Sequence, residues 1–251
     1  MKAMILAAGM GTRLRPLTDD RPKALVEIDG RTLLEIALTR LRAFGIRDVI
    51  VNVHHLAGMV IDYLKKRDNF GMRIEVSRED VLLDTGGGLK KAAWFFKDAG
   101  RHSGEDAPFL LHNVDVLSTI DFERMRQSHV ETQALATLAV QDRETSRCLL
   151  FDEQHQLCGR RTGRDQPPEL ARAARQMQAW AFSGIHMISP RLFSLMTEDG
   201  AFSIITTYLR LAAQGEKIAA FRADEYYWRD LGTPKNIAKA AQDLKQNVIA
   251  Q

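Results

Sequence analysis

A run of residues with little or no side chain follows the first apolar stretch of the chain and has the composition of an anion-binding turn. Ala8, Gly9 and Gly11 let backbone N–H groups approach a ligand closely, and glycine also accepts a positive φ. Successive N–H groups of this kind form a concave site for anions. The cation Arg13 follows at once, and Lys23 comes after a short polar loop. The sequence predicts a phosphate site at the carboxyl end of a first strand, although an ordinary turn between a strand and a helix has a similar composition.

The spacing of this turn excludes the two commonest phosphate-binding motifs. The Walker pattern closes its loop with Gly-Lys-Ser/Thr, which the turn does not contain. The dinucleotide-binding pattern needs a third glycine where Leu14 stands. The turn therefore belongs to another type of phosphate site.

Two aspartates lie at the ends of predicted strands far apart in the chain. Asp115 closes the string His-Asn-Val-Asp after an apolar strand, and Asp230 precedes a Gly-Thr-Pro helix start. Ligand clefts of doubly wound α/β proteins lie at the carboxyl ends of strands. Two carboxylates can hold one Mg²⁺ while phosphate oxygens and water complete its coordination. Each aspartate alone is more typical of a helix cap or a turn, but beside a phosphate turn the two predict a Mg²⁺ site.

Three consecutive glycines, Gly86, Gly87 and Gly88, follow Asp84 and Thr85 between a predicted strand and a predicted helix. Glycine permits a tight turn or close backbone approach to a flat or charged group. We therefore expect these glycines at a ligand and not in packing. The alternative is the first turn of a helix with Thr85 or Asp84 as its cap.

The elements that must position these residues alternate between strand and helix up to about residue 130. Strands are expected at 2–6, 48–53, 71–77 and 109–112, and helices at 33–44, 59–64 and 89–96. This rhythm predicts an α/β protein with a Rossmann-like, doubly wound mixed sheet.

The pattern changes in the second half of the chain. Strands are expected at 133–140, 179–188, 218–222 and 226–230, a hairpin at 148–161, a polar basic loop at 160–175, and helices at 190–196, 204–214 and 234–246. We expect one domain over residues 1–251, with a first half at 1–130 and a second half at 131–251 that carries the hairpin as a small inserted lobe.

Composition limits the partners and the compartment. Among 251 residues, 35 lysines and arginines face 32 aspartates and glutamates, so the charge gives no reason to expect nucleic acid or an anionic membrane as partner. No apolar run approaches the roughly 18–20 residues that span a bilayer, and the start lacks a secretory apolar region. Cys148 and Cys158 are expected to be reduced thiols. These features predict a cytoplasmic protein. The oligomeric state, monomer or homodimer, stays open.

The complete string from Leu6 to Thr18, followed by Pro22-Lys23, resembles the signature of the sugar-1-phosphate nucleotidyltransferases. The strings at 112–115 and 228–234 resemble that family's Asn-Gly-Asp and Trp-x-Asp-x-Gly-Thr-Pro motifs. The resemblance implies a nucleotide-diphospho-sugar transferase fold. It also implies a reaction in which a sugar 1-phosphate attacks the α-phosphorus of a nucleoside triphosphate and pyrophosphate leaves. The chain looks most like N-acetylmuramate 1-phosphate uridylyltransferases, with GTP-using mannose- or heptose-1-phosphate guanylyltransferases as the alternative.

The resemblance further implies roles for individual residues. Nucleotide binding falls to Ala8, Gly9, Gly11, Thr12, Arg13, Thr85, Gly86 and Gly87; catalysis to Arg13 and Lys23; the Mg²⁺ ion to Asp115 and Asp230; and the sugar or ribose substrate to Asn113 and Gly184.

Two positions depart from the family pattern. Val114 stands where the family has glycine, and residues 159–163 lack the glutamate of the Glu-Lys-Pro string in relatives that make dTDP- or UDP-glucose. Base and sugar therefore stay open, and residues 140–180 are where specificity is expected. A second hypothesis is a non-catalytic nucleotide-sugar sensor or scaffold subunit. It is disfavoured because the two cations and both aspartates are present.

Overall fold

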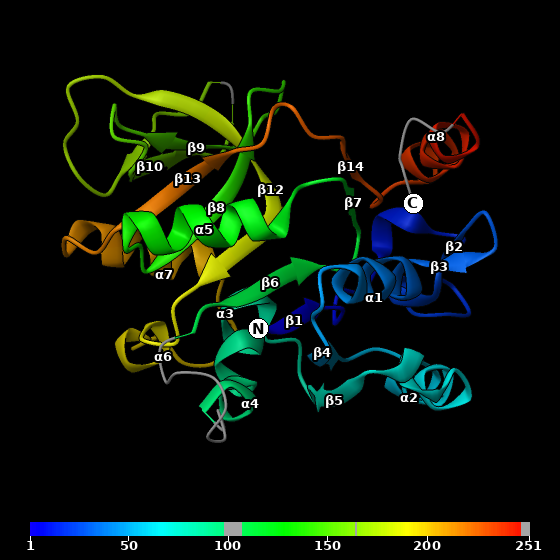
Figure 1. Cartoon of the computed structure of the whole chain (residues 1–251). Coiled ribbons are helices and arrows are strands. Elements are labelled where there is room, and N and C mark those ends of the chain that lie inside the picture. The colour runs from blue at the N-terminus through cyan, green and yellow to red at the C-terminus, as the bar shows by residue number, and fades with distance from the viewer. Residues whose placement is uncertain (98–106, 164, 247–251) are drawn as a thin grey trace.

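The computed structural model describes residues 1–97, 107–163 and 165–246 of the chain. Within these residues, ten strands form one mixed sheet in the order β11-β10-β9-β12-β6-β1-β4-β5, with β8 paired to both β12 and β13 (Figure 1). The strands are β1 (Lys2–Leu6), β4 (Asp48–Val53), β5 (Arg73–Arg78), β6 (Phe109–Asn113), β8 (Ala136–Gln141), β9 (Cys148–Phe151), β10 (Leu157–Arg161), β11 (Glu169–Leu170), β12 (Gln178–Ile188) and β13 (Ile218–Arg222). The central strands β6, β1, β4 and β5 are parallel, whereas β12 runs antiparallel to β6.

Two short ladders lie beside this sheet in the described part of the chain. One pairs β2 (Glu27–Ile28) with β3 (Arg31–Thr32), and the other pairs β7 (Val116–Ser118) with β14 (Trp228–Asp230). The helices are α1 (Leu33–Ala43), α2 (Ala57–Lys66), α3 (Asp84–Lys91), α4 (Ala93–Lys97), α5 (Phe122–Thr132), α6 (Leu192–Leu195), α7 (Ile204–Ala213) and α8 (Pro234–Lys245), with 3₁₀ turns at Thr12–Leu14, Lys23–Leu25 and Asp68–Gly71.

The sheet is covered on both faces, and strand alternation divides the core accordingly. Successive side chains of a strand point to opposite faces. In β1, Ala3 and Ile5 pack into one apolar cluster with residues of α1, α2 and α8, and Met4 packs into another with residues of α3 and α7. This two-sided burial explains why β1 and β4 read as continuous apolar runs. The expected α/β fold with a mostly parallel central sheet is confirmed.

The start of α8 is fixed by its sequence, and this places the preceding strand β14. Thr233 Oγ1 accepts the N–H of Asn236 at 3.3 Å, and Pro234 occupies the first helical turn. Both residue types favour a helix start at these positions. Asp230 is thereby held at the end of β14, just before the helix.

The glycine run from Gly86 to Gly88 differs from the expectation. A single helix was expected at 89–96, but α3 begins at Asp84 and includes all three glycines. A Cβ on Gly86 would lie 2.3 Å from the ring of Phe202, and one on Gly87 would lie 2.3 Å from the Gly200 carbonyl oxygen. The expectation that these glycines do not serve packing is therefore wrong. They let α3 approach the segment before α7 more closely than any side chain would permit.

Three further expectations concern the whole chain. Both cysteines are buried and free, as expected. No helix in the described ranges is long and apolar enough to cross a bilayer. The division into one domain with two halves stays a prediction, although strands from both halves share the central sheet.

Candidate active site

The β7–β14 ladder brings the two predicted metal ligands together. Asp230 is the register partner of Val116, and the N–H of Leu231 donates to the carbonyl oxygen of Asp115 at 2.8 Å. Asp115 directly precedes β7, so the two aspartates, here called the aspartate pair, lie at the same end of the β7–β14 ladder. Their positions in the chain are more than a hundred residues apart, so folding alone creates this proximity.

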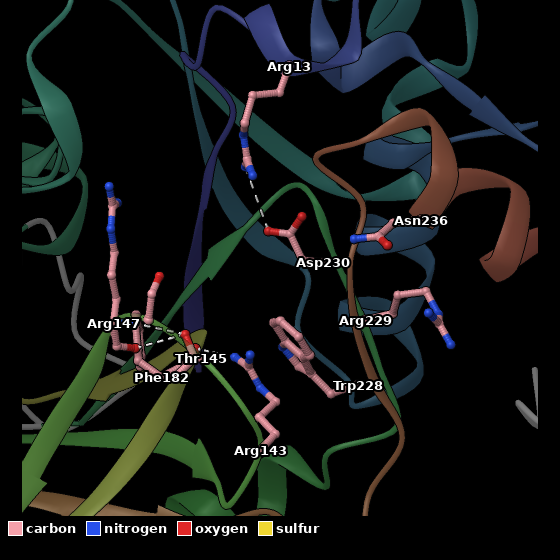
Figure 2. Close-up of a pocket in the computed structure, with 10 residues that line it drawn as sticks. Arg13, Arg143, Thr145, Arg147, Phe182, Trp228, Arg229, Asp230 and Asn236 are labelled. Carbon is pink, nitrogen blue, oxygen red and sulfur yellow. Dashed lines mark hydrogen bonds and ion pairs between the residues drawn. The ribbon is translucent and has the colours of Figure 1, made fainter. Parts of the chain in front are cut away.

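Each member of the aspartate pair faces one cation from the segment that begins at the glycine turn and ends at Lys23. Lys23 Nζ donates to Asp115 Oδ2, and the side chains are only 13% and 15% exposed. Arg13 points toward Asp230, with 3.9 Å between its Nη2 and Asp230 Oδ2 (Figure 2). The two fixed cations and the two carboxylates form a compact polar group at the carboxyl end of β1, where the sequence placed a phosphate site.

Local geometry at two glycines makes this approach possible. Gly11 has a φ of +65°, and a Cβ there would lie 2.9 Å from Thr18 Cγ2, so the turn requires glycine. A Cβ on Gly232 would lie only 2.5 Å from Arg13 Nη2. The N–H of Gly232 also donates to Asp230 Oδ1 at 2.7 Å. Asp230 thus has the turn role that the sequence offered as an alternative, and its second oxygen faces Arg13.

A hollow of about 380 Å³ lies at the carboxyl ends of β1, β4 and β6. We call it the strand-end cleft; it is lined by Leu6, Ala8, Gly9, Lys23, Asn52, Leu82, Asp84, Thr85, Asn113, Val114, Asp115 and Ala201. Many predicted site residues therefore meet here. Gly11, Thr12, Gly86 and Gly87 are not among these lining residues.

A buried polar pair that sequence reasoning missed braces this cleft. Asn52 Oδ1 accepts the N–H of Ala7 at 2.7 Å, and its Nδ2 donates to Glu79 Oε1 at 2.7 Å. Glu79 Oε2 in turn accepts the N–H of Leu83 at 3.0 Å. Both side chains are 2% exposed, so the bonds are shielded from water. One indication of this pair is visible in the sequence, because Asn52 is a polar residue within the otherwise apolar strand at 48–53.

The residues after Asp84 are largely occupied by contacts within the protein. Gly86 and Gly87 direct their N–H groups to the Phe202 carbonyl oxygen, at 2.8 and 3.3 Å. Thr85 Oγ1 accepts the N–H of Ile204 at 3.0 Å. The helix-start alternative is right about the position of α3, but neither suggested residue is its N-cap. Thr85 reaches the cleft, whereas the two glycines position the helix.

Gly184 lies against Asn113, and the substrate role expected for both residues stays a prediction. Gly184 has a φ of +73°, and a Cβ there would lie 2.8 Å from Asn113 Nδ2. The pairing of β12 with β8 shifts register between Phe182 and His186, so Gly184 occupies an irregularity of the strand. Val114, the residue that replaces the family glycine, is 3% exposed and donates its N–H to the carbonyl oxygen of Leu6 at 3.1 Å.

A second hollow, of about 870 Å³, is lined in part by all three residues of β14 (Figure 2). We call it the arginine pocket; it is lined by Arg13, Arg143, Thr145, Ser146, Arg147, Phe182, Trp228, Arg229, Asp230 and Asn236. Because Asp115 lines one hollow and Asp230 the other, the two hollows adjoin at the aspartate pair.

Arg143 is held on an aromatic platform in this pocket. Its guanidinium lies 3.6 Å from the ring centroid of Trp228, and its Nη2 donates to the Phe182 carbonyl oxygen at 2.7 Å. Trp228 is itself fixed by a 2.7 Å bond from Nε1 to the Ser183 carbonyl oxygen. Burial lowers the pKa of Arg143, and the charge of Asp230 opposes that shift. Sequence reasoning did not identify Arg143, because its segment shows no recognisable motif.

Together, the doubly wound sheet and the cations at its strand ends define an α/β protein with a polar site at the carboxyl ends of its central strands. A family model described as "Nucleotidyl transferase" matches residues 2–157. The N-acetylmuramate alpha-1-phosphate uridylyltransferase of Caulobacter vibrioides is 33% identical over 97% of this chain and 96% of its own length. The mannose-1-phosphate guanyltransferase of Yarrowia lipolytica is 30% identical over 94% of this chain, which spans 62% of that longer protein.

Among solved structures, a putative glucose-1-phosphate thymidylyltransferase from Bacillus anthracis, crystallised with sucrose, superimposes with a TM-score of 0.77. It covers all of this chain and 97% of its own, at 18% identity, which is a likeness of fold alone. The chain belongs to the nucleotidyl transferase family of enzymes. Members of this family generally use a divalent metal ion.

Proposed function

We propose that this protein joins a sugar 1-phosphate to a nucleoside triphosphate, giving a nucleotide sugar and pyrophosphate. The proposed substrates are UTP and N-acetylmuramate 1-phosphate, which the relative from Caulobacter vibrioides supports by its name and its match over nearly the full length of both chains. GTP with mannose 1-phosphate is the alternative, supported by the relative from Yarrowia lipolytica. The observation that carries the proposal is the aspartate pair with one cation facing each carboxylate.

The proposed reaction is an in-line displacement in which positioning and charge stabilisation supply most of the rate. A phosphate oxygen of the sugar 1-phosphate forms a bond to the α-phosphorus, and the bond to the pyrophosphate oxygen breaks. Ala8, Gly9, Gly11 and Thr12 lie along the turn that would receive the triphosphate. Thr85 and Asn113, across the strand-end cleft, would contact the nucleoside.

The two cations have distinct proposed tasks. Lys23, on the floor of the strand-end cleft, would contact the α-phosphate as a point charge. Arg13, which is exposed, would offset the charge that develops on the leaving pyrophosphate. Both would exchange a carboxylate partner for phosphate oxygens when substrate binds.

The aspartate pair suits a Mg²⁺ ion in donor chemistry. Carboxylate oxygens are preferred Mg²⁺ ligands, and two of them with phosphate oxygens and water make a common site. The described residues contain no group of three or more His, Cys, Asp or Glu side chains that could hold a metal by themselves. A triphosphate near Asp115 and Asp230 would be repelled unless a cation lay between them. We propose that these two residues hold Mg²⁺ with the phosphates, where it would neutralise charge that develops on phosphate oxygens.

Pyrophosphate release tests this proposal directly. Purified protein is assayed with UTP and then GTP against N-acetylmuramate 1-phosphate, mannose 1-phosphate and heptose 1-phosphate, with and without a chelator. We expect release with UTP and N-acetylmuramate 1-phosphate that stops in chelator. Tight binding of a nucleotide sugar without turnover of any pair would instead identify a non-catalytic binding subunit.

A further inference from the structure

The arginine pocket carries more positive charge than the proposed reaction accounts for. Of its lining residues, four are arginines and only Asp230 is acidic. Arg229 Nη2 is bonded to Asp243 at 2.7 Å, and Arg13 faces Asp230. Within the described ranges, Arg143 and Arg147 form no ion pair with a carboxylate. Among the described residues, these two cations of the hollow therefore have no carboxylate within ion-pair distance.

Arg143 is substantially buried and has no ion pair among the described residues, and it lines an open hollow as well, which distinguishes it from the similarly buried Arg40. Its Nε is shielded from water and has no hydrogen-bond partner in the described part of the chain. The guanidinium offers five N–H donors, and one of them is used, in the bond to Phe182. Burying a charge without a counter-ion is costly, and such charges are normally paired. The protein nevertheless holds this guanidinium in place on Trp228, which is the arrangement of a preformed anion site.

The position of Arg143 separates it from the phosphate groups. Arg143 and Arg147 come from the segment between β8 and β9, whereas Arg13 comes from the glycine turn (Figure 2). In that view Asp230 lies between Arg13 and Arg143. The reacting phosphates would occupy the side of Arg13, Lys23 and the aspartate pair. An anion at Arg143 would therefore sit at the far side of the sugar, and Arg147 is a second cation that lines the same pocket.

We propose that Arg143 and Arg147 bind a second anionic group carried by the sugar, and so select acidic sugar 1-phosphates over neutral ones. This inference rests on the proposed function, and it favours the N-acetylmuramate substrate, whose lactyl ether bears a carboxylate, over neutral mannose. A carboxylate and a second phosphate share the required chemistry, because arginine binds both through paired N–H groups.

Two matched pairs of ligands test the proposal by calorimetry in the absence of nucleotide. N-acetylmuramate 1-phosphate differs from N-acetylglucosamine 1-phosphate only in the lactyl group. Glucose 1,6-bisphosphate differs from glucose 1-phosphate only in the second phosphate. We expect the wild-type protein to bind the acidic member of one pair at least about 10-fold more tightly, which is the lower end for a charge-assisted hydrogen bond. The pair that shows this preference identifies the group.

The variants Arg143→Gln and Arg147→Gln should abolish that preference and leave binding of the neutral member within about twofold. Arg147→Gln carries the test if Arg143→Gln does not fold, since Arg147 is exposed. Arg222→Gln is the matched control, because Arg222 also stacks on a tryptophan ring, Trp180, at 4.3 Å but lies outside the pocket. The control should keep the wild-type preference.

Equal binding of both members of each pair by the wild-type protein would overturn the proposal. The proposal would also be overturned if the two variants lost affinity equally for the acidic and the neutral ligands. Such a result would mean that the arginines bind the 1-phosphate or support the fold. Pyrophosphate release separates this outcome from the proposed function. Turnover without acidic preference refutes only the inference, and preference without turnover refutes only the reaction.

Discussion

Replacing Lys23 with methionine removes one charge from the centre of the site and keeps most of the side-chain volume. In the structure the ammonium is bonded to Asp115, and both side chains are more than four-fifths buried. Methionine cannot donate to that carboxylate, which would then be left in a mostly buried position without its cation. Losing a partner of a charged, largely buried group costs about 1–3 kcal/mol of stability.

The expected loss of activity is larger than the expected loss of stability. If Lys23 stabilises charge on the α-phosphate in the transition state, its removal should lower kcat/KM by about 10²–10³. Pyrophosphate release with saturating UTP and varied sugar 1-phosphate measures the change in kcat/KM, and urea unfolding measures the change in stability. Asp115→Asn should cause a comparable loss, and the double variant should lose little more than the worse single variant, because groups that act as a unit are not additive.

Arg15→Gln is the matched control from the same loop, since Arg15 is exposed and lies 3.5 Å from Asp19. It should retain activity within about threefold, as is usual for exposed ion pairs. A Lys23→Met protein that stays folded and keeps more than about a third of wild-type kcat/KM would refute the role given to Lys23. Strictly additive losses in the double variant would refute its coupling to Asp115.

Three further predictions concern separate parts of the molecule. Gly184→Ala should cost about 2 kcal/mol, and so lower the Tm by roughly 4–8 °C, because of the positive φ and the overlap with Asn113; an unchanged melting curve would contradict this. Gly232→Ala should displace Arg13 and lower kcat/KM by about 10- to 100-fold with little change in Tm; full activity would show that the position of Arg13 does not matter. Burial lowers the histidine pKa values, so each buried histidine stabilises the fold fully above the unfolded value of 6.5 and loses that contribution as pH falls toward the folded value, at about 1.4 kcal/mol per pH unit. The folded pKa values are about 4 for His112, about 4 for His129 and about 3 for His186. Urea unfolding at pH 5.5 should therefore give a stability about 4 kcal/mol below that at pH 7.5, and a difference under about 1 kcal/mol would contradict this burial.

The sequence predicted the strands of the central sheet well because their burial leaves a simple pattern. The ranges 2–6, 48–53 and 218–222 match β1, β4 and β13 residue for residue. The region 84–97 was predicted poorly. Glycine has a low intrinsic helix preference, so a run of three argued against a helix. Tertiary packing against Phe202 and Gly200 overrides that preference. The sequence around the glycines does not indicate a contact with residues so far along the chain.

The sequence also predicted some residues of the site and missed others, for the same reason. Lys23, Asp115 and Asp230 belong to motifs at strand ends, where the fold class itself says that ligands bind. The arginine pocket could not be predicted in this way. Arg143 lies in an irregular segment, and its role depends on the register irregularity of β12, which presents the Phe182 and Ser183 carbonyl groups to Arg143 and Trp228. Such an arrangement exists only after the strands have paired.

The central claim is that two carboxylates from neighbouring strands share one divalent ion with a nucleoside triphosphate. A crystal grown with UTP and Mn²⁺ tests it most directly, because anomalous scattering locates the ion. The account predicts one peak within about 2.0–2.4 Å of a carboxylate oxygen from each of Asp115 and Asp230 and of a phosphate oxygen, with Lys23 and Arg13 turned to the phosphates. An ion held by the nucleotide alone, with Asp115 still bonded to Lys23 and Asp230 still facing Arg13, would contradict it.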